Sequence, residues 1–97
     1  MALTITNIDE LRNYKNQIEK TKISYDEKIN ELTNTIKSTA LYWQGEDGEV
    51  FRTNLYSLID NDLKCISKEM SAELEYLKKL IIVLENAQEQ VKSRLNG

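Results

Sequence analysis

The chain has 97 residues, of which 30% are charged and 40% are hydrophobic, and its net charge is −3. This length allows a single domain, and the composition is that of a folded globular chain rather than a disordered one. The acidic balance argues against nucleic-acid binding, because proteins that bind nucleic acids concentrate Lys and Arg on one face.

Few residues interrupt helices in this chain, which contains no Pro and three Gly, so long helices are expected. No stretch approaches the ~20 apolar residues that span a bilayer, and the N-terminus lacks the basic and apolar blocks of a secretory signal peptide. Cys65 has no second cysteine for an internal disulfide. These features predict a protein made in the cytoplasm, which leaves it only by a route that needs no such signal.

The first predicted helix covers about residues 7–42. Thr6 and Asp9 are spaced as in a capping box at its start. Lys15 and Lys22 interrupt a seam that is otherwise apolar and predicts an amphipathic helix. Residues at two heptad positions form this seam: Ile8, Ile29, Ile36 and Trp43 at one, and Leu11, Ile18, Tyr25 and Leu32 at the other.

A turn over 43–48 precedes the second predicted helix, which covers about residues 49–93. Gly45 is expected to close the first helix in the left-handed conformation, and Asp47 is expected to cap the second. Glu46, Asp47 and Glu49 place negative charge at the positive end of the second helix dipole. The apolar residues of this helix follow three-and-four spacing: Phe51, Leu55, Leu58, Leu63, Ile66, Met70, Leu74, Leu77, Ile81, Leu84 and Val91.

The short turn forces the two helices to run antiparallel within one domain, residues 1–97. With the turn near residue 45, Lys15 is expected to face Glu73 or Glu75, and Lys22 is expected to face Glu69. These acids would then accept the lysines of the seam and favour one register.

The hairpin carries more apolar residues than one seam can bury. The run Leu80–Leu84 surrounds the second helix with apolar side chains, and such a helix is normally buried on all sides. The predicted fold is therefore all-α: an antiparallel two-helix hairpin that pairs with a second hairpin into a four-helix bundle dimer. The residues predicted to form this partner interface are Tyr14, Ile18, Tyr25, Leu77, Leu80, Ile81, Ile82 and Leu84.

Trp43-Gln44-Gly45 lies near the centre of the chain, where the two helical patterns are interrupted. Trp43 ends the first seam, so its indole is expected to fold into the mouth of the bundle. If the indole is fully enclosed there, Trp43→Ala would cost about 3–5 kcal/mol. Two roles fit this position, a lid over the core and a recognition element, and spacing alone favours the lid.

These residues carry a resemblance to the WXG family, the hundred-residue Trp-x-Gly proteins exported by type VII secretion in Gram-positive bacteria and mycobacteria. The resemblance covers nearly the whole chain. It rests on the size, on Trp43 and Gly45 between two long helices, on Phe51 eight residues after Trp43, and on the missing signal peptide. Asp47 stands where the family often has a small residue.

The resemblance implies a secreted helical hairpin that pairs as a homodimer or heterodimer, leaves the cell folded through an ATPase-driven machine, and is linked to virulence. It implies Trp43, Gly45 and Phe51 as the secretion motif. Many members add a Tyr-x-x-x-Asp/Glu signal beyond the second helix, and the residues after Glu85 contain no Tyr. The resemblance therefore implies that a related partner supplies this signal, or that the chain accompanies a larger toxin with an N-terminal helical domain.

The sequence offers no catalytic, cofactor or metal site, because it has no His and no Gly-rich phosphate loop. Cys65 is expected to be a small buried hydrophobe. An enzyme is therefore not expected. Two other classes remain: an intracellular coiled-coil scaffold, which would not need Trp43, and a membrane-active helical protein, which the acidic balance disfavours.

Overall fold

A computed structural model describes residues 5–96 of the chain, with side chains from Asn7 to Leu95, and the elements it contains are helical. Helix α1 covers Ile5–Ser38 and continues as a single 3-10 turn, η1, over Thr39–Leu41.

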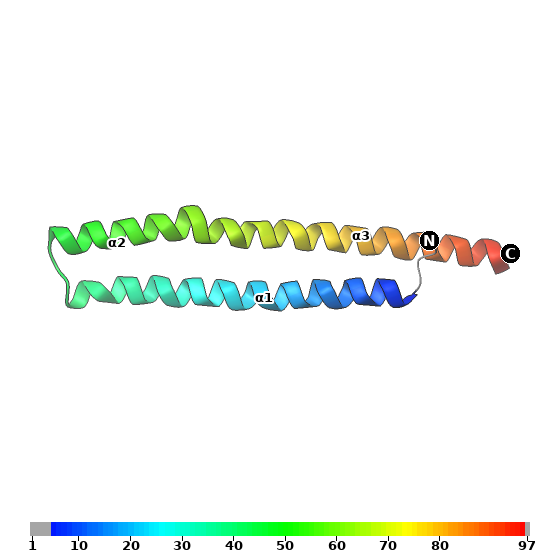
Figure 1. The fold of residues 1–97 in the computed structure, drawn as a ribbon, viewed down its shortest axis with the longest axis horizontal. Helices are drawn as coiled ribbons and strands as arrows, with labels where there is room; N and C mark the ends of the chain where they lie inside the picture. Colours follow the sequence, from blue (N-terminus) through cyan, green and yellow to red (C-terminus); the bar gives the residue numbers. More distant parts are fainter. Residues whose placement is uncertain (1–4, 97) are drawn as a thin grey trace.

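The chain then reverses and forms a second arm of three consecutive elements. These are α2 over Glu46–Leu58, a π-helical turn, η2, over Ile59–Leu63, and α3 over Lys64–Asn96. The second arm runs antiparallel to α1, and its end projects past the beginning of α1 (Figure 1). The predicted all-α hairpin is thereby confirmed.

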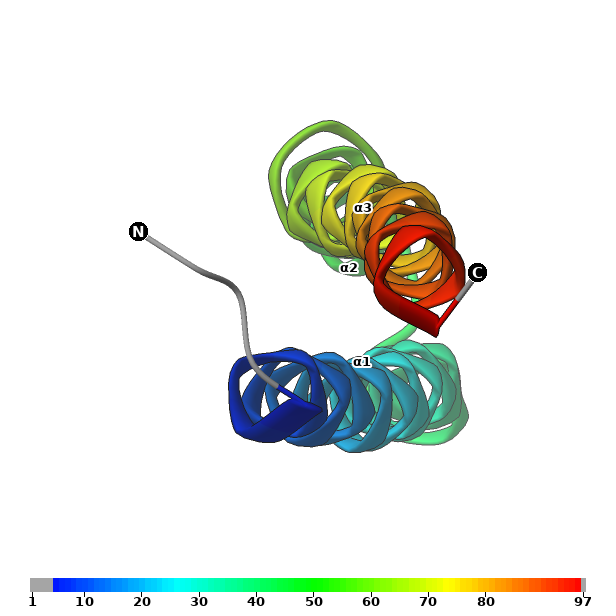
Figure 2. The same ribbon diagram turned by 90° about the vertical axis from the view of Figure 1, so that its right-hand side faces the viewer.

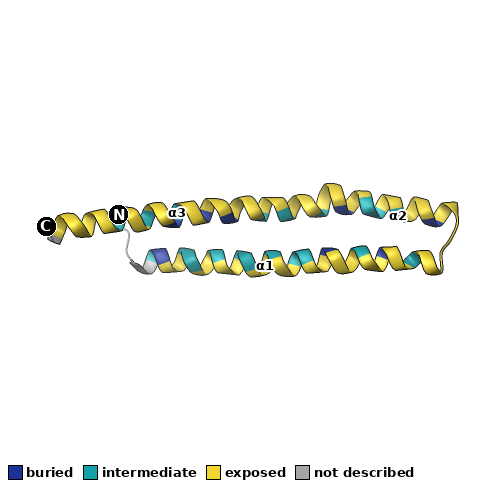
Figure 3. Cartoon of the chain, turned by 180° about the vertical axis from the view of Figure 1, so that it is seen from behind, coloured by how far each residue is buried: buried dark blue, intermediate teal, exposed yellow. Residues whose placement is uncertain are grey.

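The two arms make a rod of 76 × 18 × 17 Å. Seen along its length, the arms lie side by side and cross each other at an angle (Figure 2). Buried residues are confined to the strip where the arms meet, and most of the surface of both arms is exposed (Figure 3). Each helix therefore covers one stripe of the other, which leaves the flanks of both helices open.

The α-helical part of the first arm ends at Ser38 rather than near residue 42. Hydroxyl groups in the last turns donate to backbone carbonyls, as Thr35 does to Glu31 and Ser38 does to Asn34, both at 2.9 Å. Side chains that bond the backbone in this way compete with the helix ladder and often accompany bends. The next three residues tighten into the 3-10 turn, a common helix ending.

The caps of both helices differ from those predicted. Thr6 lies inside α1, which begins at Ile5, so Thr6 is not the N-cap; its side chain lies outside the described residues. Gly45 has φ 98° and ψ −178°, which is not the left-handed helical conformation. Its carbonyl accepts a bond from the Glu49 N–H at 3.1 Å, so Gly45, and not Asp47, is the N-cap of α2. Asp47 lies in the first turn, where the expected acidic charge is present.

The buried core contains residues from both arms. On α1, Ile8, Ile29 and Ile36 are buried as predicted, whereas Leu32 is 42% exposed. On the second arm, Leu74, Leu77 and Ile81 are buried. The cluster nearest the turn joins Ile29 and Ile36 to Ile59. The sequence pattern had assigned Leu58 to the core, but Leu58 is 48% exposed and Ile59 only 3%.

The π-helical turn explains why Ile59 replaces Leu58. The inward residues of the second arm before η2 are spaced by alternating steps of four and three, and the same alternation resumes after it. Between Leu55 and Ser67 the steps through Ile59 and Leu63 are all of four residues. The segment from Leu55 to Ser67 therefore contains one residue more than a regular repeat would. A π turn accommodates such an extra residue without rotating the rest of the helix.

The two seam lysines do not pair across the hairpin as predicted. Lys15 pairs with Glu19 at 3.5 Å, and Lys22 pairs with Asp26 at 2.7 Å, both within α1. An acid one turn along the same helix is always within reach of a lysine. The register of the two arms also differs from the predicted one. Each position of α1 lies opposite a residue further along the second arm than expected, as the bond between Asp26 and Ser67 shows.

Candidate functional site

The turn is closed by contacts around the backbone of Trp43. Arg52 in α2 donates from Nη1 to the Trp43 carbonyl at 2.8 Å and to the Thr39 hydroxyl at 3.3 Å. Gly48 is buried against the same carbonyl, and a Cβ at Gly48 would collide with the Trp43 oxygen. The sequence analysis missed Arg52 and Gly48; a second glycine three residues after Gly45 was the one available signal for a close backbone approach.

The indole of Trp43 does not enter the mouth of a bundle within the hairpin. Its ring packs on Phe51 with centroids 4.8 Å apart and planes at 37°, and Trp43 remains 40% exposed. The motif residues Trp43 and Phe51 are therefore brought together, on either side of Gly45. Because the ring is not fully enclosed, truncation of Trp43 should cost less stability than full burial would imply.

One flank of the hairpin, here called the polar side, is joined by charged and hydroxyl groups. Arg12 on α1 pairs with Glu85 on α3 at 3.1 Å, and this hydrogen bond, with that to Asp9, raises the pKa of Arg12. Ser67 on α3 donates to Asp26 at 2.6 Å. The bond from Lys22, followed by that from Ser67, lowers the pKa of Asp26.

On the opposite flank, here called the apolar groove, no ion pair joins the two arms among the described residues. Ile18 lies at the edge of the α1 seam next to the apolar groove, and Glu19, about 100° further around the helix, lies on the polar side. Glu19 lines a hollow on the polar side with Lys22 and Ser71. The apolar groove is a hollow lined by Tyr14, Ile18 and Thr21 of α1 and by Ile66, Glu69, Met70 and Glu73 of α3.

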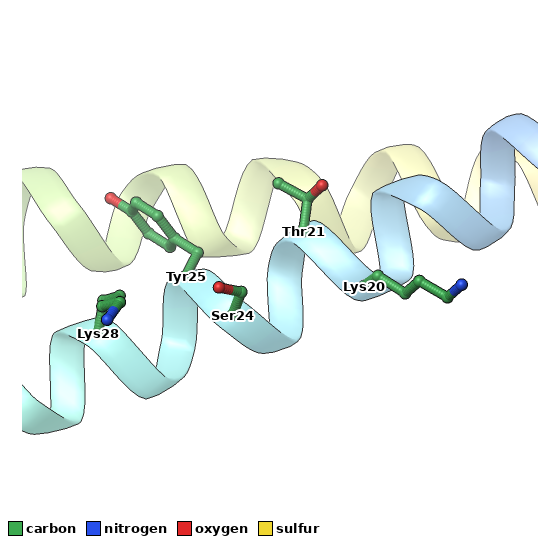
Figure 4. Close-up of a pocket in the computed structure, with 5 residues that line it drawn as sticks. All are labelled: Lys20, Thr21, Ser24, Tyr25 and Lys28. Atoms are coloured by element: carbon green, nitrogen blue, oxygen red, sulfur yellow. The ribbon is translucent and has the colours of Figure 1, made fainter.

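A second hollow lies beside the apolar groove on the surface of α1. It is lined by Lys20, Thr21, Ser24, Tyr25 and Lys28, which lie along a single helix (Figure 4). Thr21 lines both hollows, so they adjoin each other at this residue. The hydroxyl of Tyr25 crosses to the second arm and donates to the Leu63 carbonyl in η2 at 2.9 Å.

The predicted interface residues divide between the inside and the outside of the hairpin. Leu77 and Ile81 are buried between the arms, so a partner cannot reach them while the hairpin is closed. Ile18, Tyr25, Leu80 and Leu84 are half-buried. Tyr14 and Ile82 are exposed by 52% and 58%.

The exposed Cys65 and the acidic side chains are possible ligands of a metal ion. Cys65 is exposed, contrary to its predicted burial, and its thiol lies 4.0 Å from Glu69. Because the π turn takes up one extra residue, Leu63 and Ser67 face inward, and Cys65, midway between them, faces outward. Among residues 5–96, no cluster of three His, Cys, Asp or Glu side chains is placed to hold a metal ion.

Helices capable of crossing a membrane are not found within this part of the chain. No family model matches the sequence, and no match is found among curated proteins or among solved structures.

Proposed function

We propose that this hairpin acts by pairing with a second helical chain, and that it is a substrate or substrate partner of type VII secretion. The observation that carries the first part is the asymmetry of its flanks. The polar side is occupied by bonds between the arms, whereas the apolar groove presents Tyr14, Ile18, Ile66 and Met70 to solvent. Exposed apolar surface of this kind marks sites where soluble proteins bind one another.

The secretion part rests on the resemblance to the WXG family. It is supported by the arrangement at the turn, where the rings of Trp43 and Phe51 pack against each other at a tilt and stay accessible. If Trp43 served only as a lid over the core, it would be expected to be less exposed than the observed 40%. Accessible aromatic residues are common anchors in recognition by another protein.

Association can be tested by co-expressing the chain with small helical proteins and with N-terminal helical domains of toxins from the same host, followed by sedimentation analysis. A complex is expected with one of these chains or with a second copy. A toxin domain as the preferred partner would favour the role of a targeting companion. A chain that binds none of them at high concentration would contradict the pairing proposal.

Export can be tested in the native host by comparing culture supernatant and cells. The intact protein is expected in the supernatant, and disruption of the type VII ATPase should retain it in the cell. Trp43→Ala should lower export severalfold while the hairpin stays helical. Tyr42→Ala is the matched control, because Tyr42 is 78% exposed and adjoins the motif. A protein that stays in the cells of both strains would point to the scaffold alternative.

A further inference from the structure

The backbone of Trp43 is held at both of its polar groups. Its N–H donates to the Thr39 carbonyl in η1 at 2.8 Å, and its carbonyl accepts the bond from Arg52 Nη1 at 2.8 Å. The same Nη1 donates to the Thr39 hydroxyl, which itself donates to the Ile36 carbonyl at 2.6 Å. The peptide groups on both sides of Trp43 are therefore tied to the end of the first arm and to α2.

The guanidinium of Arg52 donates to neutral acceptors rather than to carboxylates. Among the described residues Arg52 forms no ion pair, although Glu49 lies only three residues before it in α2. A hydrogen bond from a charged donor is stronger than one between neutral groups. Arg52 is also half-buried, so water competes less for these bonds than at a fully exposed site. Its side chain therefore restrains the turn.

Gly48 lets the first turn of α2 come close to Trp43. It is buried, and a Cβ on Gly48 would collide with the Trp43 carbonyl oxygen and lie 3.2 Å from Cδ1 of the indole. Phe51, whose ring packs on the indole, follows in the same helix. A side chain at residue 48 would therefore push Trp43 away from α2 and from Phe51.

We propose that Arg52 and Gly48 are the positioning residues of this turn, which hold the indole of Trp43 on Phe51 in the orientation that a binding partner recognises. This assignment rests on the proposed function and adds to it two residues outside the Trp-x-Gly motif. Trp43 and Phe51 are both 40% exposed, so fixing their rings contributes little to the core. It contributes instead to binding, because side chains that are already ordered lose less conformational entropy when a partner binds.

The positioning can be measured without a partner, because Trp43 is the single tryptophan of the chain. An indole held in one orientation gives a near-ultraviolet circular dichroism band, which is lost when fixed packing is lost. Arg52→Met keeps an apolar stem and removes the donors, so it should lose most of this band while the far-ultraviolet spectrum stays helical. Arg52→Lys retains a donor and should keep more of the band than Arg52→Met does. Lys68→Ala, which removes an exposed positive charge elsewhere on the second arm, is the control and should keep the whole band.

Gly48→Ala tests the close approach through the sign of its effect. Ala is a better helix former than Gly, so without the contact to Trp43 this substitution would raise the Tm. We expect it to lower the Tm and to weaken the indole band. Asn54→Ala, at an exposed position of the same helix, is the matched control and should leave the band unchanged. A higher Tm with an intact band would overturn the role of Gly48.

Export in the native host tests whether this positioning serves recognition. Arg52→Met should lower export severalfold, as is expected of Trp43→Ala, while the variant remains folded. Added to Trp43→Ala, Arg52→Met should cause no further loss, because Arg52 acts through Trp43 and the two effects are not additive. If Arg52 had a structural role separate from the indole, the double variant would lose more export than either single variant.

The outcomes separate this inference from the function on which it rests. If Trp43→Ala lowers export and Arg52→Met does not, the positioning role is overturned and the proposed function stands. An indole band that survives in Arg52→Met would also overturn the positioning role. Normal export of Trp43→Ala would remove the recognition role of the turn and the positioning role with it.

Discussion

Replacing Tyr25 by Phe isolates the contribution of the bond between α1 and the π-helical turn. The Tyr25 hydroxyl donates to the Leu63 carbonyl at 2.9 Å and joins residues 38 positions apart in the chain. Its ring also packs against the cluster of Ile29, Ile36 and Ile59. Phe keeps that packing and removes the hydroxyl alone, so the measured change reports the hydrogen bond.

The expected loss is about 1 kcal/mol, because a net intramolecular hydrogen bond contributes about 0.5–1.5 kcal/mol. Water can partly replace the hydroxyl at this half-buried site, which argues against a larger value. For a domain of about 100 residues, this loss corresponds to a decrease in Tm of roughly 4–8 °C.

Thermal and urea unfolding followed by far-UV circular dichroism measure this loss. The protein concentration must be fixed, since association makes Tm depend on it. Tyr14→Phe is the matched control: Tyr14 is 52% exposed and has no hydrogen bond among the described residues. Its change should stay within about 0.5 kcal/mol. Equal effects of the two substitutions would refute the assigned role of the Tyr25 hydroxyl.

Three further perturbations test other features of the fold. Ile59→Ala should lower the free energy of unfolding by about 2–5 kcal/mol and Leu58→Ala by far less in urea titrations, because Ile59 is 3% exposed and Leu58 48%; the reverse order would contradict the assigned phase. Deletion of Asn61 should preserve helicity and stability by letting the π turn become α-helical, whereas deletion of Ser71 should unfold the arm by rotating the apolar stripe beyond it by about 100°. Equal damage from both deletions would argue against the inserted residue. Asp26→Asn should be less stable than wild type at neutral pH, because the fold stabilises the ionised carboxylate of Asp26 and thereby lowers its pKa below the ordinary value of 3.8. The difference in stability should shrink as the pH falls through this lowered pKa. A difference that stays constant down to pH 2 would exclude that linkage.

Heptad spacing predicts this hairpin because each long helix must bury one stripe. Ile8, Ile29 and Ile36 fall on a regular repeat, and their burial follows directly from that spacing. The absence of Pro and the short turn near Gly45 then allow one antiparallel arrangement. These features depend only on the order of the residues, so they can be predicted from the sequence.

The phase of the second arm was not predictable in the same way. A three-and-four pattern can include Leu58 or Ile59, because both are apolar and adjacent. Only the register against α1 selects Ile59, and that register depends on contacts between distant residues such as Tyr25 and Leu63. The exposure of Cys65 was missed for the same reason, since it lies just after the π turn.

The candidate site was predictable in part. Apolar residues at Leu11, Tyr14 and Ile18, and polar residues at Arg12 and Glu19, already lie on different flanks of a helix drawn from the sequence. Which acids the basic residues would bind was not predictable. A lysine can reach several carboxylates, and the small energy differences between them depend on the exact height of one arm against the other.

The segment 59–63 also defines where this protein tolerates a change of length over evolutionary time. Gain or loss of a single codon there alters only the local winding of one turn. Gain or loss of one codon a few positions downstream would instead turn the apolar face of the remaining helix toward water. Homologues that differ by one residue in this segment should therefore share the same hairpin, and an alignment of them should place its gap there.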